Sequence, residues 1–61
     1  MILPDQKQCC AAIAELADEP NLTKWEQDFV DSNEDREFFS VAQREVIYNL
    51  AKKYDLKCYS L

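Results

Sequence analysis

Apolar residues recur along the chain at the three- and four-residue spacing of an α-helix, and no stretch alternates with the period of a β-strand. Three segments follow this pattern, and each begins with a residue that caps helices well. We therefore expect one all-α domain, a small three-helix bundle with helices at roughly 5–17, 23–33 and 40–54. Residues 55–61 would form a short C-terminal tail, with Leu56 packed against the bundle.

Each expected helix opens with a capping box, in which two side chains three residues apart bond to each other's backbone. The pairs are Asp5 with Gln8, Thr23 with Glu26, and Ser40 with Gln43. In the first helix the expected apolar stripe is Cys9, Cys10, Ile13, Leu16 and Ala17. The residues expected to hold the bundle together are Trp25, Phe29, Val46, Ile47, Leu50 and Tyr54.

The composition limits the chemistry that the chain can perform. It has no His and no Gly, so it lacks the usual base near neutral pH and a phosphate-binding loop. The acidic stretch at 31–35 lacks the glycine of a calcium loop, and three Cys without His cannot complete a zinc site. We therefore predict no catalytic residue, no metal, no cofactor and no small-molecule substrate, and thus not an enzyme.

The cysteines and the short length together favour self-association. Cys9 and Cys10 are neighbours, so a bridge between them would be strained, and reduced thiols that fill the core are expected. With 61 residues, the chain buries little apolar surface and needs stability from elsewhere. We predict that homodimerisation supplies it. No signal peptide or membrane-length apolar run is visible, which favours a cytoplasmic protein without membrane contact.

The net charge of −5 is unevenly distributed along the sequence. Between residues 18 and 37, eight acids are balanced only by Lys24 and Arg36, whereas residues 44–57 are mildly basic. Three interpretations remain open: the two regions pair head to tail between protomers, one of them meets a charged partner, or both are solvated helix faces. The acidic middle is also compatible with a nucleic-acid mimic that blocks a DNA-binding protein.

The third helix carries the predicted partner-binding surface, on the side opposite its core stripe. Val41 and Tyr48 are seven residues apart and nearly aligned, and Arg44 and Lys52 lie on the same side. Tyr and Arg are enriched at binding hot spots, so we expect this surface to contact a protein partner or a second copy. The alternatives are a solvated face and a DNA-reading helix, although the negative net charge disfavours nucleic acid.

Between residues 22 and 54 the caps and apolar positions form one pattern: Leu22, Thr23, Trp25, Glu26, Phe29, Val30, Ser32, Ser40, Gln43, Val46, Ile47, Leu50, Lys53 and Tyr54. This pattern resembles a two-helix element of small, poorly characterised helical proteins of tailed, lambda-like bacteriophages and prophages. The resemblance implies a shared fold more than a shared activity. It also implies an accessory or regulatory protein of the early-region type, which acts in the bacterial host cytoplasm on a host or phage protein.

Overall fold

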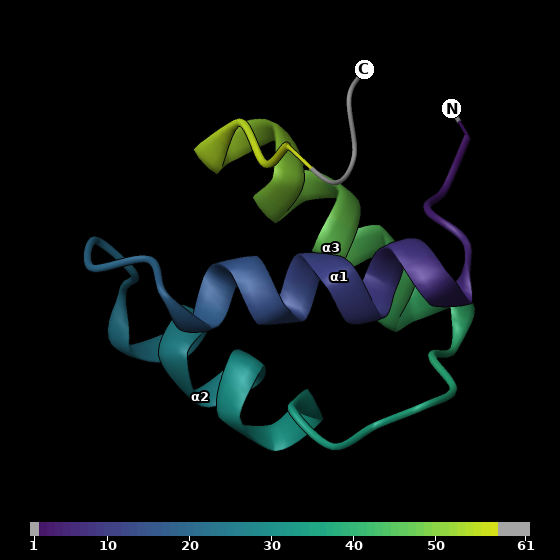
Figure 1. Cartoon of the computed structure of the whole chain (residues 1–61), viewed down its shortest axis with the longest axis horizontal. Coiled ribbons are helices and arrows are strands. Elements are labelled where there is room, and N and C mark those ends of the chain that lie inside the picture. The colour runs from purple at the N-terminus through teal and green to yellow at the C-terminus, as the bar shows by residue number, and fades with distance from the viewer. Residues whose placement is uncertain (1, 58–61) are drawn as a thin grey trace.

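Each of the three helices begins at the capping box that the sequence predicts (Figure 1). The computed structural model describes residues 2–57, in which α1 spans Gln6–Ala17, α2 spans Lys24–Asn33 and α3 spans Val41–Tyr54. No strand occurs in this part of the chain, so the all-α prediction is confirmed there. Residues 58–61, and with them most of the predicted tail, lie outside the described residues.

The capping boxes are complete in both directions. At the start of α1, the Gln8 N–H donates to Asp5 Oδ1 at 2.7 Å, and the Asp5 N–H donates to Gln8 Oε1 at 2.9 Å. The boxes that open α2 and α3 have the same reciprocal pair of bonds. These bonds satisfy N–H groups that the first helical turn leaves without a partner, so they fix where each helix begins.

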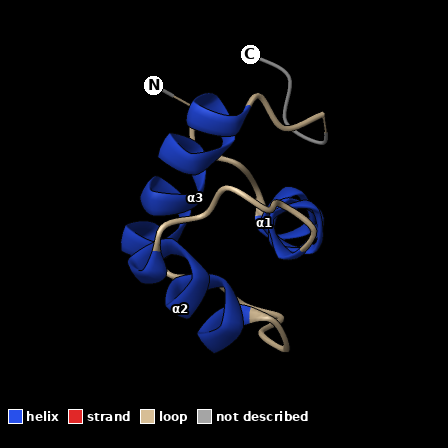
Figure 2. Ribbon diagram, turned by 90° about the vertical axis from the view of Figure 1, so that its left-hand side faces the viewer, coloured by secondary structure: helices blue, strands red, loops and turns tan. Residues whose placement is uncertain are grey.

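α1 is the central helix of the fold. Its backbone approaches those of both α2 and α3 closely, whereas the backbones of α2 and α3 make no close approach to each other. Figure 2 looks along α1 and shows α2 and α3 on one side of it. The buried stripe of α1 consists of Cys9, Ala12, Ile13 and Leu16. The stripe predicted from the sequence is therefore wrong at Cys10 and Ala17, which are exposed. Both lie about a quarter-turn away from the face that the two neighbouring helices cover.

The core contains residues from all three helices and from the loops that follow α2 and α3. Of the six residues expected to hold the bundle together, Ile47 and Leu50 are buried, and Phe29, Val46 and Tyr54 pack against the core while half-buried. Trp25 is outside the core, so that part of the prediction is wrong. The buried apolar set is Cys9, Ala12, Ile13, Leu16, Val30, Phe39, Ile47, Leu50, Ala51 and Leu56.

Phe39 closes the core from the loop between α2 and α3. It is the largest fully buried side chain among the described residues, and Gln6 of α1 holds its backbone in place. Gln6 Nε2 donates to the Phe39 carbonyl at 3.0 Å, and the Phe39 N–H donates to Gln6 Oε1 at 2.6 Å. One side-chain amide thus satisfies both backbone groups of a residue that no regular element includes.

α3 ends at Asp55, whose backbone is left-handed with φ 52° and ψ 53°. Aspartate is one of the few residues other than glycine that adopt this conformation readily. The reversal lets the Leu56 N–H donate to the Ala51 carbonyl at 3.0 Å and buries Leu56, as predicted. The next residue, Lys57, donates its N–H to Glu15 Oε1 at 3.2 Å and connects this end to α1.

Candidate functional site

Trp25 and Phe29 form a stacked aromatic pair on α2. Their ring centroids are 5.7 Å apart and their planes differ by 11°. The Thr23 cap places Trp25 in the first turn of α2, and Phe29 follows one turn later on the same side. Trp25 is 61% exposed, whereas Phe29 is half-buried against the core. Much of the Trp25 ring is therefore exposed to solvent, while the Phe29 ring on which it stacks is held by the core.

The orientation of α2 explains why Trp25 is exposed. Its buried residues are Glu26, Val30 and Asn33, which lie about a quarter-turn or more from Trp25 around the helix. The backbone of α2 closely approaches that of α1 alone, and the side of α2 that carries Trp25 is left exposed. The stripe of Leu22, Trp25 and Phe29 seen in the sequence overlaps the buried side of α2 only in part. Contiguous apolar surface left outside a core, rather than a single exposed side chain, is characteristic of interaction sites.

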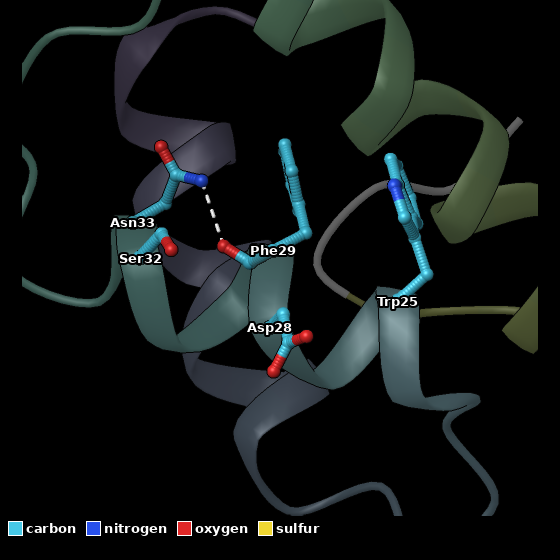
Figure 3. Close-up of a pocket in the computed structure, with 5 residues that line it drawn as sticks. All are labelled: Trp25, Asp28, Phe29, Ser32 and Asn33. Atoms are coloured by element: carbon cyan, nitrogen blue, oxygen red, sulfur yellow. Dashed lines mark hydrogen bonds between the residues drawn. The ribbon is translucent and has the colours of Figure 1, made fainter.

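The aromatic pair lines an open hollow of about 200 Å³ (Figure 3). Its other lining residues are Asp28, Ser32 and Asn33, all from the same helix. Figure 3 shows the two rings side by side, with Asn33 beyond Phe29 at the far end. Asn33 Nδ2 donates to the Phe29 carbonyl at 2.7 Å, and its Oδ1 accepts from Arg36 Nε at 2.8 Å. These bonds commit the Asn33 amide, so it shapes the hollow without offering a free polar group.

Exposed acidic residues are frequent in and after α2, the helix that lines this hollow. Asp28 lines the hollow directly, and no hydrogen bond or ion pair joins its carboxylate to any residue within 2–57. Lys24, one turn earlier, makes no ion pair with it. We call Trp25, Asp28, Phe29 and Ser32 the α2 face. Further exposed acids follow it along the chain: Asp31, Glu34, Asp35 and Glu37.

The buried carboxylate of Glu26 joins α2 to the end of α3. It accepts from the Thr23 N–H at 2.9 Å, from the Tyr54 hydroxyl, and from Lys53 Nζ at 2.7 Å. The hydrogen bonds from Lys53, Tyr54 and Thr23 lower the pKa of Glu26 from 4.5 to about 2. Because Lys53 and Tyr54 lie at the end of α3, this network joins α2 to α3, whose backbones do not approach each other closely. It thereby helps to hold α2, the helix that carries Trp25, in place.

The structure separates the four predicted partner-binding residues into two groups. Val41 and Lys52 are exposed, whereas Arg44 and Tyr48 are half-buried, and Tyr48 packs against the core. The expectation that Tyr48 lies opposite the core is therefore wrong. Lys52 Nζ lies 5.5 Å from the Tyr48 ring centre, a cation–π contact within the helix. We call these four residues the α3 face, whose role in binding stays a prediction.

The two described cysteines differ in accessibility. Cys9 is buried, with its Sγ 3.8 Å from the Pro4 carbonyl, and burial raises the pKa of its thiol to about 11. Cys10 is exposed. The expectation that both residues fill the core is therefore right for Cys9 and wrong for Cys10. Cys58 lies outside the described residues.

We expect iodoacetamide to modify Cys10 well before Cys9 in the folded protein. The thiolate is the reactive form, and the raised pKa leaves Cys9 about a hundredfold less thiolate than an ordinary thiol at neutral pH. Fragment spectra of the alkylated peptide, taken over time in a Cys58→Ser background, distinguish the two sites. Urea should bring the two rates together. Equal rates in the folded protein would contradict the burial of Cys9.

Within residues 2–57, no group of three or more Cys, Asp or Glu side chains is arranged to hold a metal ion. None of the helices in that range is long and apolar enough to cross a membrane. No protein family, curated protein or solved structure matches the chain.

Proposed function

We propose that this chain is a non-enzymatic protein–protein interaction module that binds a cationic partner protein through its α2 face. The observation that carries the proposal is the position of Trp25, which is 61% exposed and stacked on a ring that the core holds. Trp is the residue most enriched among binding hot spots, because it buries a large area with little loss of side-chain entropy. The Glu26 network fixes the helix that carries it, so little ordering is needed on binding.

The charge around the α2 face selects the kind of partner. Asp28 is one of the residues that line the hollow, and four more exposed acids follow it in the sequence before α3 begins. A symmetric dimer through this face would place the carboxylates of two copies against each other, which is unfavourable. A positively charged surface on another protein is therefore the preferred occupant. The predicted homodimer stays a prediction, and sedimentation at several concentrations tests it.

The resemblance to small phage and prophage proteins suggests where the proposed module acts. On this basis the module is an accessory or regulatory factor in the bacterial cytoplasm, and its partner is a host or phage protein. A nucleic-acid mimic would also bind a cationic protein, but it needs only carboxylates and makes no use of an exposed tryptophan. A DNA-reading α3 is less favoured, because Lys53 is paired with Glu26 and Arg44 is half-buried.

Panning a random peptide library against the folded chain tests the proposal. We expect enriched peptides to share a motif and to lose more than about tenfold in affinity for Trp25→Ala, since truncated hot spots commonly cost that much. Trp25 lies outside the core, so this variant should keep its helical circular dichroism. Val41→Ala removes another exposed apolar side chain, on the α3 face, and serves as the matched control.

The two variants separate the possible outcomes. Peptides that bind Trp25→Ala as well as the unmodified chain overturn the proposed site, and a loss confined to Val41→Ala moves the interface to the α3 face. Binding that survives Trp25→Ala but disappears with added salt indicates the mimic instead.

A further inference from the structure

We propose that the hollow on α2 recognises an arginine side chain of the partner, stacked on the Trp25–Phe29 pair and hydrogen-bonded to Asp28. This inference rests on the proposed function and specifies the chemical group that the α2 face binds. It concerns the five residues that line the hollow, in which an exposed aromatic surface and a carboxylate occur together.

Asp28 is the only charged residue among those that line the hollow. Its carboxylate has no hydrogen bond or ion pair with the described residues, and the nearby carboxylate of Glu26 is already paired with Lys53. The Asn33 amide is committed to Phe29 and Arg36. The hollow therefore offers one unpaired negative charge, which a single cationic side chain would neutralise.

The aromatic surface favours arginine over lysine. The rings are stacked, with planes that differ by only 11°, so Trp25 keeps one flat aromatic face that Phe29 does not cover. A guanidinium is planar, stacks on aromatic faces, and loses less hydration than an ammonium when it is covered. Residues three apart on a helix have Cβ atoms about 5–6 Å from each other. The Asp28 carboxylate, which points away from the rings in Figure 3, can therefore reach a guanidinium on Trp25 once its exposed side chain rotates. The guanidinium's fork of N–H donors also matches a carboxylate better than one ammonium does.

The library-selected peptide provides the probe for a direct test. We expect the selected motif to contain arginine, and we would replace that residue by lysine, by citrulline or by leucine. Citrulline keeps the planar shape and removes the charge. Trp25 is the only tryptophan of the chain, so its fluorescence reports on the hollow when the peptide contains none. The arginine peptide should bind at least about tenfold more tightly than the citrulline peptide.

Two matched variants assign this preference to Asp28. Asp28→Asn keeps the shape of the side chain and should remove most of the preference for arginine over citrulline. Asp31→Asn changes an exposed acid of the same helix that does not line the hollow, and it should leave the preference in place. Anisotropy of the labelled peptides measures all of these affinities in the same way.

The outcomes distinguish this inference from the proposed function. If the selected peptides depend on Trp25 but contain no arginine, or bind equally well with citrulline, the arginine inference is overturned and the interaction module stands. If Asp28→Asn and Asp31→Asn reduce the preference for arginine over citrulline equally, that preference comes from the overall negative charge of α2 and not from the hollow. The inference is then also overturned. If no selected peptide depends on Trp25, the proposed function itself fails.

Discussion

Replacing Phe39 with alanine is expected to lower the free energy of unfolding by about 3–5 kcal/mol, the usual cost of removing a buried phenylalanine. A domain of 61 residues has about 3–9 kcal/mol of stability in total at the usual value per residue. The variant should therefore keep about 6 kcal/mol at most, and it unfolds at room temperature if the chain lies near the lower end of that range. Urea denaturation followed by circular dichroism measures the difference.

The adjacent phenylalanine supplies the control for this experiment. Phe38 is 71% exposed, so Phe38→Ala removes the same side chain one position earlier without opening a cavity. We expect its free energy of unfolding to stay within about 0.5 kcal/mol of the unmodified chain, as for most surface substitutions. Comparable losses for the two variants would show that the loop does not insert Phe39 into the core.

Replacing Glu26 with glutamine should destabilise the fold and also reduce the dependence of its stability on acid. The pKa of Glu26 is about 2 in the folded chain, against 4.5 ordinarily, so folding favours its ionised form. This contribution is fully present above the higher value and is lost as the pH falls from about 4.5 to about 2. The melting temperature of the unmodified chain should therefore fall more steeply over this interval than that of Glu26→Gln.

Replacement by glutamine removes the charge of Glu26 but keeps its role in the capping box. Glutamine at this position completes a capping box as well as glutamate does, so the start of α2 is preserved. Glu34→Gln removes an exposed carboxylate just beyond the same helix and should leave the steepness of the melting-temperature curve almost unchanged. If Glu26→Gln and Glu34→Gln gave identical curves, the bond between Lys53 and Glu26 would contribute nothing to the folded state.

The sequence was sufficient to predict the helices, because capping boxes act over four residues and need no information about distant contacts. It was not sufficient to predict which side of α2 is covered. Trp25 and Phe29 form a stripe with Leu22 in the sequence, yet the covered side of the helix is that of Glu26, Val30 and Asn33. That choice depends on how the helices are arranged. A strongly polar residue such as Glu26 becomes buried only because Lys53 and Tyr54 of another helix meet it.

The candidate site was missed for the same reason. The prediction placed binding on the α3 face, because Val41 and Tyr48 are apolar and lie off the main stripe. The packing of Tyr48 against the core and the exposure of Trp25 both follow from helix arrangement. One signal was present in the sequence: the segment with the only tryptophan also has the densest run of acids, which is unusual for a residue that merely fills a core.

The outer side of α2 takes little part in holding the chain together, and this has an evolutionary consequence. Ser32 and Asp28 are exposed and lie on one helix, away from the central α1 contacts. Most substitutions at such positions change stability only slightly. If the α2 face binds a partner as proposed, a lineage that carries this chain can change its binding target through a few neighbouring codons, while the fold around α1 stays intact.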